Sequence, residues 1–339
     1  QQIGPAVHAE AQARRPWFGH GGMIGYVGVG HVGSPLGHVV TEAMRALPVG
    51  VPKVCMSTLA AGDIAPFVDV KDILMMPSVI DVSGVNRISR VLIAQLAGAI
   101  CGMANVRVPP TDKERPIVAA SMFGNTTQCV DTCRRLLEQA GYEVLVFHAT
   151  GAGGRAMEML VDEGRIDAVL DITTTEWADE VCGGILSAGP DRLSAPGRRG
   201  VPHLVVPGCI DMANFGPVDT VPRHFRDAGR QLYCWSPTVT LMRTNVEENK
   251  SLGRIFAEKL NVARGPRAVL LPMQGVSILD GEGMRFCDRE ADRAMFAALR
   301  EHLDTEIPVR EVDANINDKE FAEQAVGTLL EMIRTQERN

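Results

Sequence analysis

The sequence predicts an α/β protein in which parallel sheets are covered by helices on both faces. From about residue 23 onward, short runs rich in β-branched residues alternate with amphipathic helical runs, which is the pattern of such sheets. The chain has 339 residues, of which 45% are apolar and 22% charged. This length is enough for two domains, and the composition is that of a globular protein and excludes a disordered tail, a coiled coil or a collagen-like fibre.

Each expected element follows from its hydrophobic pattern. Short apolar runs bounded by glycine, proline or polar residues predict strands at 24–29, 53–56, 116–120, 143–147, 168–171, 203–206, 267–271 and 309–312. Apolar residues at three-and-four spacing predict helices at 86–103, 126–140, 154–163, 247–262, 289–303 and 319–333. No internal repeat interrupts this alternation.

The proline-rich segment Pro109–Pro116 is the expected linker, because it is polar and separates a helix from a strand. It divides the chain into an N-terminal domain at 23–108 and a C-terminal domain at 116–339, with 1–22 as a poorly ordered or atypical start. Residues 91–106 form the most apolar stretch, which is too short to cross a bilayer, so no membrane segment is expected.

The net charge and the spacing of the cysteines limit the kinds of ligand and the cellular location that we expect. The net charge of −7, without a basic cluster, disfavours a nucleic-acid partner and leaves a small molecule as the expected ligand. The eight cysteines include no Cys-x-x-Cys pair, which indicates reduced thiols, a cytoplasmic location and no bound metal.

In the N-terminal domain, ligand-binding candidates follow the predicted strands, because parallel sheets bind ligands beyond the carboxyl ends of their strands. A Gly-x-Gly-x-x-Gly pattern permits close approach of backbone amides to phosphate. The alternative for the glycines is that they serve only the packing of helix on strand. For Asn86 and Arg87, which precede a predicted helix, a helix cap and a solvated charge are equally consistent with the sequence. The candidates are Gly28, Gly30, Gly33, Ser34, Ser57, Thr58, Gly62, Asp63, Asn86 and Arg87.

The C-terminal domain has polar turns of the same kind. The stretch 147–158 reads as strand, glycine-rich turn and helix start and resembles an anion cradle, although it lacks the Gly-Lys-Ser/Thr ending of a Walker A loop. Arg155 is either an anion ligand or an ordinary surface arginine. The ligand-facing candidates are Asn125, Thr126, Thr150, Gly151, Gly153, Gly154, Arg155, Thr174 and Glu176.

Acid–base chemistry has only weak candidates in this domain. Glu176, Asp179 and Glu180 lie within one helical turn, and His148 immediately follows the strand predicted at 143–147. Each has a structural alternative, since a lone histidine at a strand end is often a hydrogen-bonded structural residue and acidic residues at a helix start favour the helix dipole. No catalytic residue is therefore assigned, and whether the protein is an enzyme stays open.

Several strings, taken in order, resemble one family. They are 43–53, 57–63, 86–90, 147–151, 170–176, 237–243 and 316–318. The family is that of the ATP-binding region of the tomato tobamovirus-resistance protein and its uncharacterised bacterial relatives. The resemblance implies two Rossmann-like, doubly wound lobes, a ligand in the cleft between them, ATP with or without Mg²⁺ in the N-terminal lobe, and a homodimer.

The chain departs from this family pattern in three places. The strand and Gly-Thr-Phe-Asp-Thr-Lys-Gly turn expected before Met23 are absent, which implies a truncated N-terminal lobe. The run of glycines is replaced by 30–35, which includes Pro35 and so offers fewer amide donors. Cys234–Ser236 stands where relatives carry histidine and asparagine.

Three interpretations follow from the resemblance and its departures. The first is a protein that binds ATP. The second is an ATP-dependent enzyme acting on a small anionic metabolite held by the C-terminal lobe. The third is a fragment that has lost nucleotide binding. A dehydrogenase is disfavoured, because the acidic residue that would bind the ribose does not follow the second strand.

Overall fold

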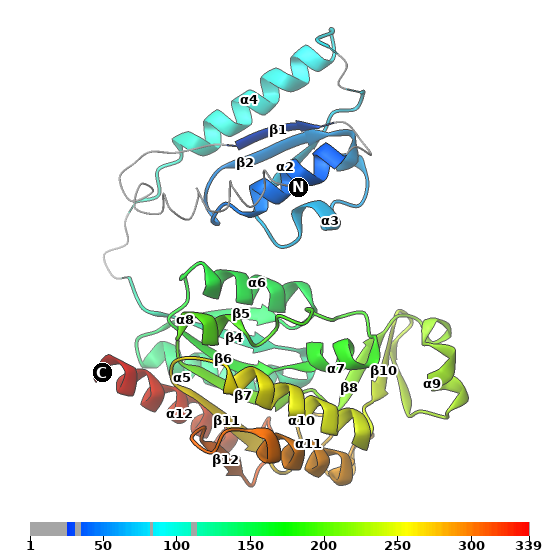
Figure 1. Ribbon diagram of the computed structural model, residues 1–339, viewed down its shortest axis with the longest axis vertical. Coiled ribbons are helices and arrows are strands. Elements are labelled where there is room, and N and C mark those ends of the chain that lie inside the picture. The colour runs from blue at the N-terminus through cyan, green and yellow to red at the C-terminus, as the bar shows by residue number, and fades with distance from the viewer. Residues whose placement is uncertain (1–25, 31–34, 82–83, 110–113, 339) are drawn as a thin grey trace. The chain divides into compact units, whose positions relative to one another are not determined.

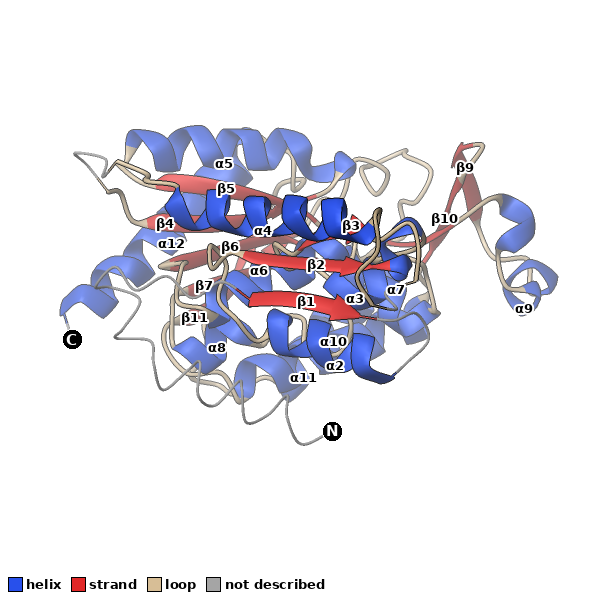
Figure 2. Ribbon diagram, turned by 90° about the horizontal axis from the view of Figure 1, so that it is seen from above, coloured by secondary structure: helices blue, strands red, loops and turns tan. Residues whose placement is uncertain are grey.

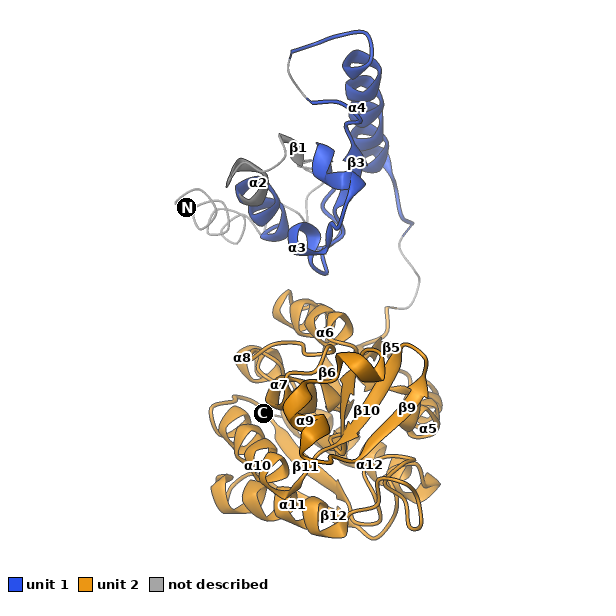
Figure 3. Ribbon diagram, turned by 90° about the vertical axis from the view of Figure 1, so that its right-hand side faces the viewer, with its two compact units in different colours: residues 1–112 blue, residues 113–339 orange. Residues whose placement is uncertain are grey.

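The computed structural model describes residues 26–30, 35–81, 84–109 and 114–338, which form two compact units. Unit 1 comprises residues 1–112 and unit 2 residues 113–339, so the division falls inside the proline-rich segment (Figure 3). The expected atypical start at 1–22 lies outside the described residues, as do Gly33 and Ser34.

Unit 1 is built on a parallel three-stranded sheet in the order β1-β2-β3. Figure 2 shows β1 and β2 running side by side in the same direction. The strands are β1 (Tyr26–Gly30), β2 (Lys53–Ser57) and β3 (Leu74–Pro77). The helices are α2 (Pro35–Arg45), η2 (Thr58–Ala61), α3 (Ala65–Val68) and α4 (Ser89–Asn105).

Strand β2 is buried because both faces of the sheet are covered. Cys55 packs with Met44 of α2 and with Val68 of α3 on one face. Val54 and Met56 point to the other face and pack against the apolar side of α4 around Leu96. This arrangement leaves the turns after the strands at the edge of unit 1.

Unit 2 is built on a parallel six-stranded sheet in the order β12-β11-β7-β6-β4-β5. Its strands are β4 (Ile117–Met122), β5 (Glu143–His148), β6 (Ala168–Thr173), β7 (His203–Gly208), β11 (Arg267–Pro272) and β12 (Val309–Val312). Its longer helices are α5 (Thr127–Gln139), α6 (Ala152–Asp162), α7 (Thr175–Cys182), α10 (Val246–Asn261), α11 (Arg289–His302) and α12 (Lys319–Arg338). The strand order reverses between β4 and β6, which is where doubly wound sheets bind ligands.

Two hydrophobic layers enclose this sheet. Helices α5 and α12 pack on one face, where Leu137 and Phe321 meet alternate residues of the central strands. Helices α10 and α11 pack on the other face through Phe256 and Met295, beside α6 and the short α8 (Ala195–Arg199). The predicted α/β class with parallel sheets is therefore confirmed.

The predicted strands and helices recur with small shifts, but one subdomain of unit 2 was not expected. An antiparallel sheet in the order β8-β10-β9 extends beyond the parallel sheet, together with α9 (Arg223–Asp227) (Figure 1). Its strands are β8 (Met212–Phe215), β9 (Leu232–Ser236) and β10 (Val239–Arg243). Within the described ranges, no helix has the length and hydropathy needed to span a bilayer.

Candidate functional site

The strands of unit 1 bring three sequence positions to one edge of the sheet. Gly30 lies opposite Ser57 in the β1–β2 register, and Ser57 lies opposite Pro77 in the β2–β3 register. The first strand therefore ends beside the loop that was predicted to face a ligand. Gly28 lies opposite Cys55 inside β1, two residues before the turn, so this glycine is part of the strand and not of the phosphate-binding turn expected from the sequence.

The loop after β2 is held by its own polar side chains. Ser57 is buried, and its Oγ accepts a hydrogen bond from the amide of Leu59 at 3.2 Å, which caps η2. The amide of Gly62 donates a hydrogen bond to the carbonyl of Leu59 at the end of η2. The Oδ1 of exposed Asp63 accepts a bond from the amide of Ala65 at 3.0 Å and caps α3.

Thr58 differs from its neighbours in this loop. Its Oγ1 is buried and has no hydrogen-bond partner among the residues that the structure describes. A buried hydroxyl without a partner costs free energy, which a ligand or an ordered water can recover. Thr58 is therefore the position in this loop with unused hydrogen-bonding capacity.

Asn86 serves as a helix cap, which was the structural alternative for this residue. Its Oδ1 accepts hydrogen bonds from the amides of Ile88 and Ser89, both at 2.9 Å, and its own amide donates to Ser89 Oγ at 2.9 Å. These bonds satisfy amides that the first turn of α4 would otherwise leave unpaired. The neighbouring Arg87 is exposed.

At the edge of the unit 2 sheet, several residues that were predicted to face a ligand are buried inside the unit. Thr126 and Thr174 are fully buried, with Thr126 Oγ1 2.7 Å from Thr173 Oγ1 and Thr174 Oγ1 donating to the carbonyl of Val206. Asn125 is 2% exposed, and its Oδ1 has no partner within the described part of the chain. These side chains join neighbouring strands and do not present a ligand-facing surface.

The glycine-rich turn, defined here as Thr150–Arg155, already holds an anion of the chain itself. The amides of Gly151 and Gly154 both donate to Oε1 of Glu176, at 2.7 and 3.0 Å. Glu176 is 1% exposed. The expected anion cradle is therefore present as geometry, but Glu176 belongs to its interior and not to a ligand-facing surface.

The other members of the glycine-rich turn are less buried. Thr150 Oγ1 donates to the carbonyl of His148, and Arg155 Nη1 donates to the carbonyl of Ser187 at 3.3 Å. Gly153 is required by space, because a Cβ there would lie 1.8 Å from the carbonyl oxygen of His148. The glycine-rich turn is consequently held by hydrogen bonds to the carbonyls of His148 and Ser187.

Arg192, which has no local sequence signature, is the centre of a buried ion cluster. We define the carboxylate cluster as Arg192 with Asp171, Glu176 and Glu158. Arg192 donates to both oxygens of Asp171 at 2.5 and 2.6 Å, to Glu176 Oε2 at 2.7 Å and to Glu158 Oε1 at 3.3 Å. All four residues are buried.

The electrostatics of the carboxylate cluster follow from burial and from one shared cation. Burial opposes ionisation of Asp171, but the Arg192 guanidinium beside it holds the pKa of Asp171 well below its usual range. The same carboxylates raise the pKa of Arg192. Burial raises the pKa of Glu158, although its oxygens also accept bonds from three backbone amides at the start of α8.

Asp179 is a second buried carboxyl group on α7. Burial raises its pKa to about 7, against the bonds that it accepts from the backbone amide and Nδ2 of Asn214. Asn214 Oδ1 is itself buried without a partner in the described residues.

A second ion cluster lies between β10 and α11. Arg243 is 4% exposed and contacts Asp280 at 3.3 Å and Asp292 at 2.7 Å. Nearby, burial raises the pKa of Asp211 to about 6, and its Oδ2 accepts from Ser277 Oγ at 2.8 Å. Among the described residues no group of three or more His, Cys, Asp or Glu side chains is arranged to bind a metal ion.

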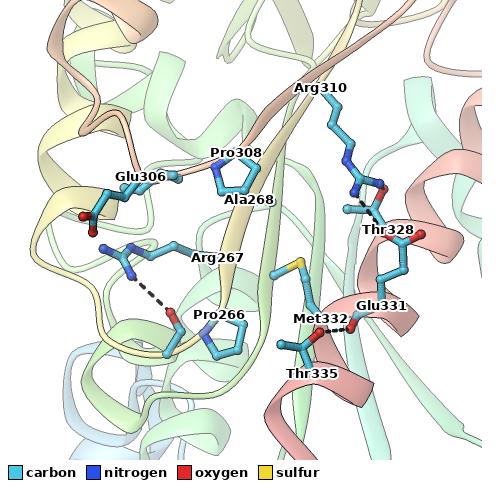
Figure 4. A pocket seen from close by; sticks show the side chains of 12 residues that line it. Pro266, Arg267, Ala268, Glu306, Pro308, Arg310, Thr328, Glu331, Met332 and Thr335 are labelled. Atoms are coloured by element: carbon cyan, nitrogen blue, oxygen red, sulfur yellow. Dashed lines mark hydrogen bonds and ion pairs between the residues drawn. The ribbon is translucent and has the colours of Figure 1, made fainter. Parts of the chain in front are cut away.

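One cavity lies at the opposite end of the unit 2 sheet, at the amino ends of β11 and β12. It has a volume of about 370 Å³. Figure 4 shows Arg310 directed to Thr328 and Glu331. Arg267 donates to the carbonyls of Gly265 and Leu260. Its arginines thus bind the chain itself, and it lies away from the carboxyl ends where parallel sheets bind ligands.

The two parallel sheets, each with polar turns at the carboxyl ends of its strands, define a two-unit α/β protein, and the strand order of unit 2 is of the doubly wound class. Residues 8–109 match the N-terminal domain of the uncharacterised protein family UPF0261, and residues 115–333 match its C-terminal domain. The chain belongs to the uncharacterised protein family UPF0261.

Similar proteins occur in bacteria and in a plant. A UPF0261 protein of Clostridium tetani is 48% identical over 313 residues, which cover 92% of this chain and 76% of that protein. One from Rhizobium meliloti is 47% identical over 306 residues, covering 90% and 75%. The ToMV resistance protein Tm-1(GCR237) of Solanum lycopersicum is 41% identical over 318 residues, covering 91% of this chain but 42% of the tomato protein. The resemblance to the tomato protein and its bacterial relatives is therefore confirmed at the level of the family.

Proposed function

We propose that the chain is a nucleotide-binding protein that takes ATP, with or without Mg²⁺, at the carboxyl edge of the unit 1 sheet. The observation that carries this proposal is the alignment of Gly30 and Ser57 at one edge, next to the buried Thr58 hydroxyl that has no partner among the described residues. ATP itself is what the resemblance to the tobamovirus-resistance family implies.

The residues present fit a phosphate group. Ser57 Oγ accepts from the amide of Leu59, so its hydroxyl hydrogen stays free to donate to a phosphate oxygen. The Thr58 hydroxyl can donate in the same way. Asp63 uses Oδ1 to cap α3, which leaves Oδ2 for a water molecule bound to Mg²⁺. Bound Mg²⁺ would neutralise part of the phosphate charge.

Thr58→Val is the variant that tests this site, because valine keeps the shape of threonine and removes the hydroxyl. We expect the affinity for Mg·ATP to fall by about 10- to 100-fold, since one hydrogen bond to a charged group contributes roughly 1.5–3 kcal/mol. Titration calorimetry measures this change. Thermal unfolding provides a second readout, because ATP at about a hundred times its Kd stabilises the folded state by about 2.7 kcal/mol.

Thr240→Val is the matched control in unit 2. Thr240 Oγ1 is also buried without a partner in the described part of the chain, but it lies on β10. Both variants remove an unpaired hydroxyl, so neither is expected to destabilise the protein without nucleotide. An equal loss of ATP affinity in both variants, or no ATP binding by the folded parent chain, would contradict the proposal.

A further inference from the structure

The start of α6 is capped by a side chain from a distant part of the sequence. Its N-cap residue is Gly151, which has no side chain to accept the amide of the third helical residue. Glu176 Oε1 takes that place and accepts from the amides of both Gly151 and Gly154. Two amides and a helix N-terminus that converge on one oxygen have the chemistry of a phosphate or carboxylate site.

The turn is shaped around this carboxylate. A Cβ on Gly154 would lie 2.2 Å from Glu176 Oε2, so no larger residue fits while Glu176 is in place. Gly151 has φ of +81° and would meet the carbonyl of Ser187 at 2.6 Å if it carried a Cβ. Gly154 therefore serves the approach of Glu176 to the backbone, whereas Gly151 is required by its positive φ and by the nearby backbone of Ser187.

Arg192 fixes the other oxygen of the same carboxylate. Its Nε donates to Glu176 Oε2 at 2.7 Å, while its Nη atoms bind Asp171. Displacing Glu176 would therefore break two hydrogen bonds from backbone amides and one ion pair, and it would leave part of a buried guanidinium unpaired. An anion from solvent would have to compensate all of these losses.

We propose that Glu176 is the resident anion of the glycine-rich turn, an internal latch that joins the β5–α6 turn to α7 and closes the turn to external phosphate and carboxylate ligands. The latch does not depend on where ATP binds. It implies that unit 2 contributes no free amide cradle at this turn, so an anionic ligand of the protein is held elsewhere.

Glu176→Ala tests the latch by chemical rescue. The substitution removes the equivalent of one acetate ion, and we expect the thermal midpoint to fall by roughly 10 °C or more. Sodium acetate should then raise the midpoint of this variant in a saturable manner, whereas sodium chloride at equal ionic strength should not. The parent chain and Glu180→Ala, which removes an exposed carboxylate of the same helix, should show no specific acetate effect.

A measurement on the parent chain decides the question even if Glu176→Ala does not fold. In nuclear magnetic resonance spectra, inorganic phosphate should leave the amide resonances of Gly151 and Gly154 unchanged up to millimolar concentrations. Saturable shifts of these two resonances with phosphate would overturn the proposal. So would a folded Glu176→Ala variant that is as stable as the parent, or one that acetate does not stabilise more than chloride does.

Discussion

Replacing Arg192 by methionine removes the cation of the carboxylate cluster and keeps most of the side-chain volume. In the parent chain Arg192 donates five hydrogen bonds, four to carboxylate oxygens and one to the carbonyl of Thr173. Its side chain is 1% exposed. Water therefore cannot replace these bonds without opening the core of unit 2.

The expected cost follows from removing one partner of a buried ion pair. Such a change typically costs 3–5 kcal/mol, because the remaining charge stays buried and unpaired. Domains of this size are stable by only about 5–15 kcal/mol. Arg192→Met should therefore remove about a fifth or more of the free energy of unfolding, and lower the urea midpoint by about 1–2 M.

Arg198→Met is the matched control for urea unfolding. Arg198 also pairs with a carboxylate, Asp162 at 2.6 Å, but the two side chains are 46% and 42% exposed. An exposed pair of this kind contributes about 0–1 kcal/mol. If Arg192→Met costs no more than Arg198→Met, the carboxylate cluster does not stabilise unit 2 as argued.

The pH dependence of Arg192→Met supplies a second readout. In the parent chain the pKa of Asp171 is lowered on folding, so its stabilising contribution is present above the unfolded pKa of about 3.9 and is lost as the pH falls through the folded value. Without Arg192, burial raises the pKa of Asp171 above the unfolded value. The variant should therefore regain stability as the pH falls from 7 to 5, and a pH profile parallel to that of the parent would refute this reasoning.

Two further predictions concern the same unit. Gly154→Ala should destabilise unit 2 by roughly 2–4 kcal/mol in urea unfolding, because its Cβ would overlap Glu176. The control Gly327→Ala has open space on α12 and should stabilise the unit by up to about 1 kcal/mol. Equal effects of the two substitutions would contradict the close packing of Gly154 against Glu176. Burial raises the pKa of Asp179 to about 7. The contribution of this group to the free energy of unfolding is therefore present below the unfolded pKa of about 3.9 and is lost as the pH rises toward 7. Asp179→Asn should consequently remove part of the loss of stability between pH 5 and 8, and an unchanged slope would show that Asp179 is ionised in the folded state.

The fold could be predicted from the sequence because parallel strands and their helices carry local periodic patterns. Strand β6 is buried throughout and β12 matches the expected range, 309–312. The antiparallel strands were missed because they lie outside the alternation of strand and helix on which the prediction rested, and because β9 is half exposed. Strand β3 was missed because none of its four residues is buried.

The interior of the candidate site was much less predictable. The glycine-rich turn was identified as an anion cradle, but the sequence offers no sign that Glu176, 22 residues beyond Gly154, fills it. Arg192 follows a turn between α7 and α8, and its partners Asp171 and Glu158 lie 21 and 34 residues away. Contacts of this kind depend on the packing of whole elements, which local patterns do not encode.

Hydrogen–deuterium exchange of the parent chain with and without Mg·ATP tests the central proposal most directly. Binding at unit 1 predicts slower exchange in peptides that cover 53–63, while peptides that cover 148–158 keep the same protection in both states. Protection that appears at 148–158 and not at 53–63 would place the phosphates at the glycine-rich turn and contradict both the proposed nucleotide site and the Glu176 latch.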